Sequence, residues 1–352
     1  MFPPRFLCPQ RQRHGRTKHT HTQRRVHPQF RSLIFLLSVS TAPSLAYESI
    51  GSVKNLRPVV PGTALLYRAA SLDSLSRDDA RTLLDGSALG GDNGESRGEI
   101  RPLAAVIDLR NSDEIRRGER DRTDGATHFY SQLRVRGVDD DGGSDLGPRL
   151  IHEPILGDVD SFWDEAISRM PPASRVRATV ETVWNGGALD RAAARHLEDG
   201  GLAMLYTVML VTAPSRLGRA LRACAEESKR GPVIFHCQKG KDRTGVLAML
   251  IQICLGSSEK DIIEAYRLSG SLLGEEDGNA RMIRTDGNSK NSGGGMVNWS
   301  YFRGSPSSAM ADTLQWIREQ HGSVEGYLDS SASFGAEERG VLRDIICADL
   351  AL

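Results

Sequence analysis

Residues 233–245 read Val-Ile-Phe-His-Cys-Gln-Lys-Gly-Lys-Asp-Arg-Thr-Gly, and a second apolar run, Val246 to Leu255, follows them. A short apolar run, a polar stretch containing glycine and a longer apolar run predict, in that order, a buried strand, a tight loop and a helix. Cys237 and Arg243 are separated by five residues, with Gly240 between them. The sequence therefore predicts an α/β unit in which the loop joins a buried strand to a helix.

The loop has the composition of a phosphate-binding site built around a thiolate. Backbone N–H groups of a tight loop can converge on phosphate oxygens, and the N-terminus of the next helix adds partial positive charge. The same field, together with His236, Lys239 and Lys241, favours thiolate over thiol at Cys237. Arg243 carries the planar guanidinium that fits two phosphate oxygens. The alternative is a buried structural cysteine beside a solvated basic loop.

The ending Gly-Lys-Asp-Arg-Thr-Gly and the preceding His-Cys give the loop a specific resemblance. The stretch resembles the active-site loop of the cysteine-dependent protein tyrosine phosphatase superfamily. It is most similar to the atypical tyrosine/serine protein phosphatases, a group that includes enzymes acting on phosphoinositides. Discontinuous similarity extends from about Leu56 to Leu350 and includes Asp108-Leu109-Arg110 with Glu114. The resemblance implies an α/β fold with a central, mostly parallel sheet flanked by helices.

The resemblance also implies roles for the loop residues. Cys237 would attack phosphorus and form a cysteinyl-phosphate that water hydrolyses, while Arg243 holds the phosphate oxygens. Thr244 stands where a hydroxyl assists departure of the thiolate. The remaining predicted phosphate-binding residues are Gln238, Lys239, Gly240, Lys241 and Gly245. We expect neither a metal nor another cofactor, because the loop itself would neutralise the phosphate charge.

The general acid is less clear in the sequence. The stretch before the catalytic strand, residues 201–232, offers only two adjacent glutamates on an amphipathic helix. Asp242, inside the loop, is the candidate that the resemblance favours. The alternative is that Asp242 accepts hydrogen bonds that shape the loop.

Asp108 ends a second apolar run, residues 103–109, which predicts a buried strand. In open α/β sheets, functional residues gather beyond the carboxyl ends of the strands, where Asp108 and Cys237 would both lie. Asp108 would either position the active-site loop or take part in proton transfer. Alternatively, Asp108, Arg110 and Glu114 tie the strand end to its neighbours through ion pairs.

The overall charge makes nucleic acid an improbable partner. The chain of 352 residues has 45 basic and 45 acidic residues, but eight of the basic ones and none of the acidic ones lie in residues 1–47. The rest of the chain carries 37 basic against 45 acidic residues, a net charge of about −8.

The five cysteines match no metal or disulfide framework. A working Cys237 thiolate would fit a reducing compartment.

The chain predicts one catalytic domain, residues 56–350, behind a tail. Residues 1–47 combine a basic lead, a short apolar run over 33–39 and small residues, which indicates a signal or transit peptide; without one the protein would be cytoplasmic. The apolar run is too short to cross a bilayer.

Two segments of the catalytic domain are predicted to be insertions. Residues 160–200 predict a helical insertion, either a mobile lid or a fixed layer, and residues 274–309 predict a flexible loop rich in Gly, Asn and Ser. Residues 128–133 predict a strand.

The sequence leaves the substrate open between two classes. Phosphotyrosine proteins, with phosphoserine or phosphothreonine proteins as further substrates, suit the resemblance, whereas Lys239 and Lys241 would suit a phosphoinositide head group. Alternatively, the protein is a binding module, a catalytically inactive phosphatase fold that recognises phosphorylated partners. A thiolate enzyme that acts on arsenate or transfers sulfur is a third interpretation. Such enzymes share a loop of this kind, but this interpretation does not explain the resemblance at Asp108 to Glu114. The sequence does not indicate an oligomeric state.

Overall fold

The computed structural model describes residues 52–89, 100–135, 147–156, 159–275 and 302–350. The chain divides into two units, 1–46 and 47–352, and every described residue belongs to the second. The predicted targeting segment therefore lies outside the described residues. Within those residues, no helix has the length and apolar character that crossing a bilayer requires.

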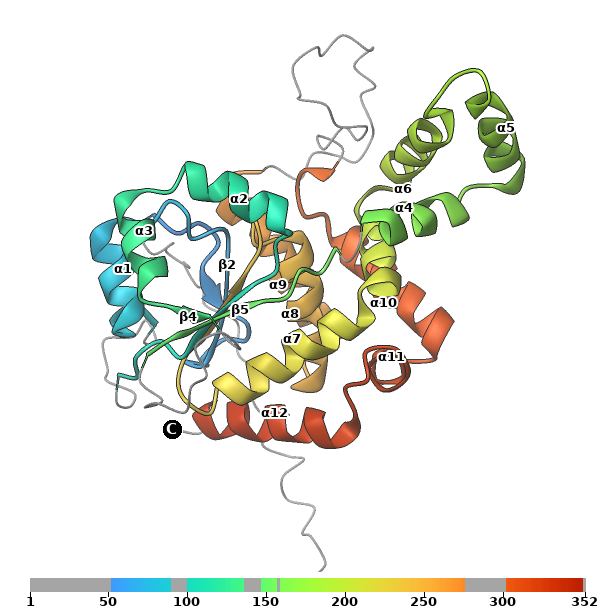
Figure 1. Ribbon diagram of the computed structural model, residues 1–352. Coiled ribbons are helices and arrows are strands. Elements are labelled where there is room, and N and C mark those ends of the chain that lie inside the picture. The colour runs from blue at the N-terminus through green and yellow to red at the C-terminus, as the bar shows by residue number, and fades with distance from the viewer. Residues whose placement is uncertain (1–51, 90–99, 136–146, 157–158, 276–301, 351–352) are drawn as a thin grey trace, which may run out of the picture. The chain divides into compact units, whose positions relative to one another are not determined.

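A six-stranded sheet forms the centre of the second unit (Figure 1). Its order is β1-β2-β6-β3-β5-β4, and all neighbours run parallel except β1 and β2. The predicted α/β fold with a mostly parallel sheet is thus confirmed. The strands are β1 (Arg57–Pro58), β2 (Leu66–Ala69), β3 (Ala105–Asp108), β4 (Arg134–Val135), β5 (Arg149–His152) and β6 (Val233–His236).

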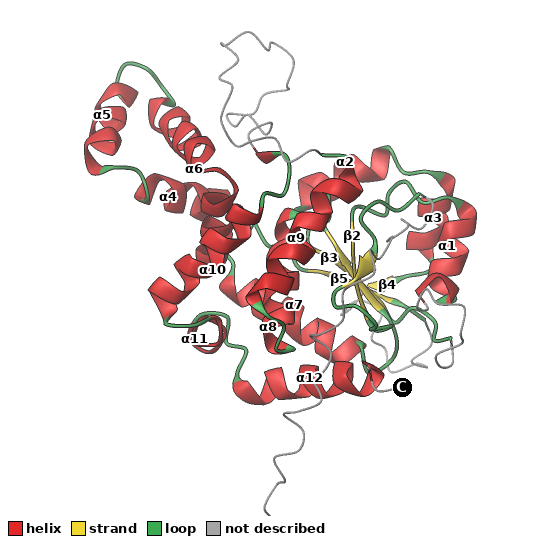
Figure 2. Ribbon diagram, turned by 180° about the vertical axis from the view of Figure 1, so that it is seen from behind, coloured by secondary structure: helices red, strands yellow, loops and turns green. Residues whose placement is uncertain are grey.

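Helices cover both faces of this sheet (Figure 2). The helices of the described residues are α1 (Arg77–Leu84), α2 (Ser112–Arg120), α3 (Asp124–Ser131), α4 (Val159–Ser168), α5 (Pro172–Thr182), α6 (Ala188–Thr212), α7 (Pro214–Glu227), α8 (Asp242–Cys254), α9 (Glu259–Leu273), α10 (Ser307–His321), α11 (Val324–Ser330) and α12 (Ala336–Leu350), with a 3-10 turn at Ser87–Leu89.

The strands place alternate side chains in two cores, as their pleat requires. Leu66, Val233 and Phe235 contribute to the larger core, which α6 to α12 complete. Tyr67 and Ile234, one residue along, contribute to the smaller core with α1 and α3. Because both faces are covered, the central strands read as continuous apolar runs, which is why the sequence predicted them. Helix α8 lies within the larger core and is buried almost all round.

Three neighbouring strands end level with one another. In the parallel register, His236 of β6 pairs with Ala69 of β2 on one side and with Asp108 of β3 on the other. The chain therefore leaves the sheet at Ala70, Cys237 and Leu109 along one edge. This confirms the expectation that the loop after β6 and the segment after β3 share the carboxyl edge of the sheet.

The predicted strand over 128–133 is wrong, because residues 124–131 form α3. Thr123 caps this helix through a hydrogen bond from the Ala126 N–H to its hydroxyl. Ala126, Phe129 and Leu133 are buried at helical spacing, and this periodicity outweighs the strand preference of the aromatic pair at 129–130.

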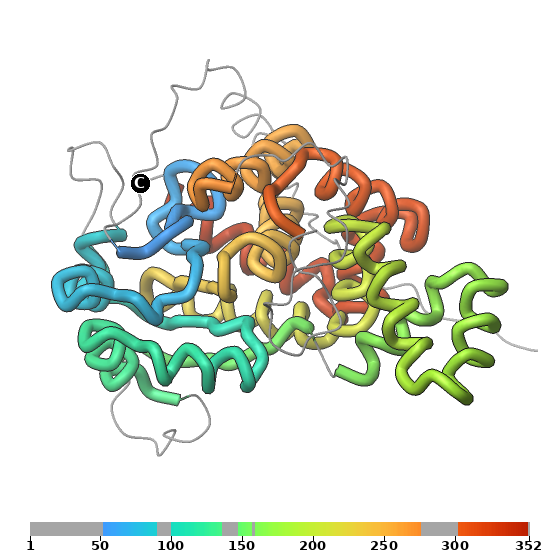
Figure 3. Tube along the Cα trace, turned by 90° about the horizontal axis from the view of Figure 1, so that it is seen from above, coloured from blue at the N-terminus to red at the C-terminus, as the bar shows by residue number. Residues whose placement is uncertain are grey.

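The predicted helices of segment 160–200 are present as α4, α5 and the first part of α6 (Figure 3). They form a small apolar cluster of their own around Met170, Ala178 and Ala193. Helix α6 changes direction at Gly201, whose φ of 61° lies in the left-handed region. Motion of these helices as a lid stays a prediction.

The two ends of segment 274–309, predicted to be a flexible loop, have fixed contacts. Residues 276–301 lie outside the described residues, but Glu275 and Gly304 contact the active-site loop through polar bonds given below. Phe302 and Ser305 are buried, and α10 already begins at Ser307. The described parts of this segment therefore belong to the folded domain.

Candidate active site

The loop of residues 237–241 joins β6 directly to α8, as the sequence predicts. Cys237 is the first residue after the strand and is only 1% exposed. Asp242, Arg243 and Thr244 form the first turn of α8. The loop thus leads from a buried sulfur to the N-terminus of a buried helix, where free N–H groups and the helix dipole favour an anion.

The carbonyl side of the loop is bonded to the surrounding protein. The Gln238 carbonyl accepts a hydrogen bond from the Ser71 N–H at 3.1 Å. The Asn55 amide donates to the carbonyls of Lys239 and Gly240, at 3.2 and 2.8 Å. These three consecutive carbonyls therefore have partners outside the loop, which fixes its backbone.

Gly240 is required at the closest approach of the loop to the sheet. Its φ is +65°, which disfavours any residue with a Cβ. A Cβ built there would lie 2.2 Å from the Ala69 carbonyl oxygen at the end of β2. The loop can therefore lie against β2 only with glycine at this position.

Arg243 is held by a carboxylate from another helix. Both terminal nitrogens of its guanidinium donate to Glu114, which also accepts the Asn111 N–H at the start of α2. Burial opposes the charge of Arg243, but Cys237 and Glu114 outweigh burial and raise its pKa. The pair uses two of the five N–H donors of the guanidinium, so the others are left for a phosphate.

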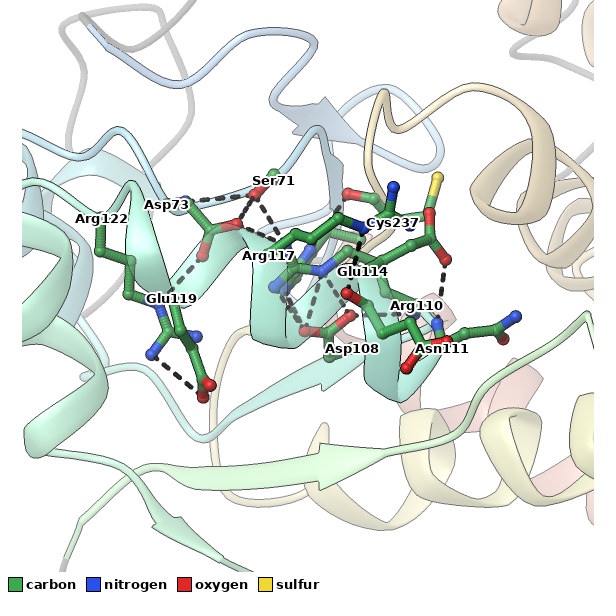
Figure 4. A network of polar contacts seen from close by, with 12 residues as sticks. Ser71, Asp73, Asp108, Arg110, Asn111, Glu114, Arg117, Glu119, Arg122 and Cys237 are labelled. Atoms are coloured by element: carbon green, nitrogen blue, oxygen red, sulfur yellow. Dashed lines mark hydrogen bonds and ion pairs between the residues drawn. The ribbon is translucent and has the colours of Figure 1, made fainter. Parts of the chain in front are cut away.

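Asp108 takes part in a buried ionic network behind the loop (Figure 4). It accepts three hydrogen bonds from the Arg110 guanidinium, at 2.7 to 3.1 Å. Arg110 also contacts Asp73 and donates to the Ser71 hydroxyl at 3.1 Å. Burial opposes the charge of Asp108, but the neighbouring His236 and the hydrogen bonds and charge of Arg110 outweigh burial and lower the pKa of Asp108 to about 2.

These contacts agree with the alternative in which Asp108 forms ion pairs that tie the end of β3 to its neighbours. The Ser71 hydroxyl accepts a hydrogen bond from Arg110, and the Ser71 backbone N–H donates one to the Gln238 carbonyl. Asp108 is therefore connected to the loop through Arg110 and Ser71. We infer that it supports the loop rather than transferring a proton.

Asp242 accepts a hydrogen bond from one of two buried tyrosines that contact each other. The Tyr206 hydroxyl donates to Asp242 Oδ1 at 2.7 Å and lies 2.7 Å from the Tyr266 hydroxyl. Since Tyr206 has one hydrogen and gives it to Asp242, Tyr266 is the donor between the two hydroxyls. Burial and the charge of Asp242 raise the pKa of Tyr206, which keeps it a donor.

The two lysines of the loop have partners in the protein that the sequence did not indicate. The Lys241 side chain is fully buried, and its Nζ donates to the carbonyls of Phe302 and Gly304 at 2.7 and 2.6 Å. Lys239 Nζ is bonded to Glu275, which also lies 3.3 Å from Lys241 Nζ. The predicted phosphate contact from Lys241 is therefore not supported, because its donors are directed to backbone carbonyls beside the loop.

His236, Thr244 and Gly245 are all buried. Burial lowers the pKa of His236, so its imidazole is neutral at pH 7, and Nε2 lies 3.8 Å from Asp108. The Thr244 hydroxyl oxygen has no hydrogen-bond partner among the described residues. A buried hydroxyl without a partner is costly, so it is available to a group that enters the loop.

Two residues outside the predicted site, Arg68 and Asn55, also contact the loop. Arg68, at the third position of β2, is buried beneath the loop and donates to the Gly240 carbonyl at 2.8 Å. Burial lowers its pKa to about 10, so it is still a cation at neutral pH. Asn55 bonds the same carbonyl and has a φ of 60°, which asparagine tolerates better than most residues. Arg68 belongs to the segment Leu66-Tyr67-Arg68, which is part of the discontinuous similarity that begins at about Leu56, whereas Asn55 stands in no motif. Only the fold shows that both residues contact the loop.

A comparison with known protein families identifies the family of the chain. The family model described as "Tyrosine phosphatase family" matches residues 57–348, which include the loop, α2 and every tyrosine and lysine named above. No curated protein matches the sequence. With most of its length covered by that model, the chain belongs to the tyrosine phosphatase family.

Proposed function

We propose that the protein is a cysteine-dependent phosphomonoester hydrolase that acts on phosphotyrosine proteins, with phosphoserine and phosphothreonine proteins as further substrates. The observation that carries the proposal is the placement of Cys237 at the start of a fixed loop and of Arg243 in the first turn of the helix that follows it, with Arg243 bound by Glu114. Family membership supports phosphatase activity in general. The geometry adds a nucleophile and an oriented cation at the same edge of the sheet.

The first step transfers the phosphoryl group to sulfur. The Cys237 thiolate attacks phosphorus, the S–P bond forms, and the ester P–O bond breaks with its electron pair on the leaving oxygen. Arg243 and the N–H groups at the start of α8 bind the non-bridging oxygens, and Arg68 adds positive charge beneath the loop.

Asp242 supplies the proton that the leaving oxygen needs. Tyr206 donates to Oδ1, so the proton to be transferred belongs on Oδ2. In the second step the resulting carboxylate accepts a proton from water, water attacks phosphorus, and the S–P bond breaks to regenerate the thiolate. The unpartnered Thr244 hydroxyl stabilises the departing sulfur by donating a hydrogen bond.

The contacts of the loop lysines support a protein substrate over a phosphoinositide with several phosphates. That alternative rests on two free lysine charges in the loop, and both lysines contact Glu275. A lipid head group with several phosphates would therefore meet a carboxylate at Lys239.

Hydrolysis of a generic aryl phosphate tests the proposal. We expect the wild type to turn over, Cys237→Ser to lose all activity, and Cys347→Ser, a change at a cysteine on α12, to retain it. Substantial activity in Cys237→Ser would refute the mechanism. A wild type that binds phosphate esters without hydrolysing them would be the silent binding module.

A further inference from the structure

Glu275 is a carboxylate outside the loop that contacts both loop lysines. It follows the C-terminus of α9, where Gly274 takes a left-handed conformation and the Glu275 N–H bonds the Gly270 carbonyl at 2.9 Å. Its side chain accepts from Lys239 Nζ, from Lys241 Nζ and from the Gly304 N–H at 3.1 Å. These contacts fix the carboxylate beside the loop, and its side chain is 16% exposed.

The two lysines differ in what else they contact. Lys241 is buried and satisfied by two backbone carbonyls, so its charge is confined to the protein interior. Lys239 is 46% exposed, and Glu275 is the partner that its ammonium has among the described residues. Lys239 is therefore the loop lysine that can turn toward a ligand, and Glu275 is the group that competes for it.

Glu275 provides the charge that balances the exposed loop lysine. Lys239 and Lys241 both face Glu275, and two backbone carbonyls bind Lys241 in addition. Burial opposes the charge of Glu275, but the hydrogen bond from Lys239 and the charge of Lys241 outweigh it and lower its pKa. Glu275 is thus ionised throughout the neutral range, and it neutralises the exposed ammonium of Lys239.

We propose that Glu275 is a specificity-determining residue that restricts the site to singly phosphorylated esters. It neutralises Lys239 and places a negative charge where a second phosphate on the substrate would have to bind. Discrimination of this kind comes from a repulsive group aimed at the wrong ligand. The inference rests on the proposed function, because it concerns the substrates of the same loop.

The test compares two substrates that differ by one phosphate, a short-chain phosphatidylinositol monophosphate and the corresponding bisphosphate. The measured quantity is the ratio of kcat/KM for the bisphosphate to kcat/KM for the monophosphate. Glutamine is the replacement because its amide oxygen still accepts hydrogen bonds from Lys241 and Gly304. We expect Glu275→Gln to raise the ratio about tenfold, the effect of one additional charged hydrogen bond at a partly exposed site.

Two further variants isolate the cause. In Lys239→Gln/Glu275→Gln the ratio should return to that of the wild type, because no ammonium is left to bind the second phosphate. Glu264→Gln, an exposed change on α9 whose partner is Arg267, should leave the ratio as it is. An unaltered ratio in Glu275→Gln, or the same rise in the double variant, would overturn the proposal.

Binding measurements separate this proposal from the proposed function. If the wild type hydrolyses no phosphate ester at all, the proposed function fails, and the specificity of the loop is then measured by calorimetry with inositol mono- and bisphosphate. Glu275→Gln should again increase the preference for the bisphosphate about tenfold. Equal affinities before and after the change would contradict the inference independently of catalysis.

Discussion

Glu114 and Arg243 are 129 residues apart in sequence and form a two-point ion pair between the start of α2 and the start of α8. Glu114 also accepts the Asn111 N–H, so one carboxylate both caps α2 and orients the guanidinium. Burial opposes the charge of Glu114, but the hydrogen bonds from Arg243 outweigh it and lower its pKa. The geometry of the phosphate clamp is therefore set from outside the loop.

Replacing Glu114 should impair catalysis more than folding. Glu114→Ala removes both hydrogen bonds to Arg243, and losing charged hydrogen bonds that orient a catalytic cation costs on the order of 10²-fold in kcat/KM. Glu114→Gln keeps one acceptor oxygen for Arg243 and should lose less. Kinetics on an aryl phosphate measure both effects. Full activity in Glu114→Ala would mean that Arg243 needs no partner to be oriented.

The Tyr206–Asp242 bond gives the proposed acid a distinct signature. Asp242→Asn should lower kcat more for alkyl phosphates, whose leaving oxygen needs a proton, than for aryl phosphates with good leaving groups. Tyr206→Phe should show the same leaving-group dependence with a smaller loss, about tenfold for the alkyl ester, because it removes one hydrogen bond to Asp242. Steady-state kinetics over a series of leaving groups provide the measurement. Equal losses on all esters would assign Asp242 to shaping the loop.

Gly240 and Gly256 allow steric contact to be separated from backbone strain. Both have a left-handed φ, +65° and +81°, but a Cβ on Gly256 meets nothing within 4 Å. Gly256→Ala should cost only the conformational strain, roughly 1–2 kcal/mol of unfolding free energy. Gly240→Ala adds a collision with the Ala69 backbone and should abolish activity and destabilise further. Urea unfolding with parallel assays measures both; identical behaviour of the two variants would contradict the close approach.

Asp108 should make stability depend on acid pH. Its pKa is lowered from 3.8 to about 2 in the folded protein, so the ionised form stabilises the fold above the unfolded value. That contribution, about 2 kcal/mol, is lost as pH falls from about 4 to about 2. Asp108→Asn should weaken this dependence and destabilise at pH 7, because it leaves Arg110 buried without that charge. Urea midpoints between pH 7 and pH 3 measure it, and an unchanged acid slope in the variant would assign the dependence to other carboxylates.

The sequence predicted the parts of the site that are local in the chain. The strand, loop and helix around Cys237 follow one another within about twenty residues, and their apolar periods and glycine identify them without tertiary information. The position of Asp108 followed from a general property of parallel sheets, whose carboxyl ends meet at one edge. The observed register, in which Asp108 pairs with His236, confirms that β3 and β6 end at the same edge.

The remaining parts depend on contacts between distant segments. The sequence suggested that Lys239 and Lys241 carry free charge, because their carboxylate partner, Glu275, lies more than thirty residues further on. Arg68 and Tyr206 lie in segments whose resemblance to the family is weak, and their contacts arise only when β2 and α6 pack beside the loop. In residues 128–133 the aromatic residues have a local preference for a strand. The structure has a helix over most of this segment because α3 packs against α1.

Trapping of the covalent intermediate tests the central claim most directly. Thr244→Ala should slow the second step, because the hydroxyl that stabilises the departing sulfur is gone. After rapid quenching with a radiolabelled aryl phosphate, we predict stoichiometric labelling of the peptide that contains Cys237, and no labelling when Cys237→Ser is combined with Thr244→Ala. Turnover without labelled protein, or a label on any other residue, would contradict a cysteinyl-phosphate mechanism.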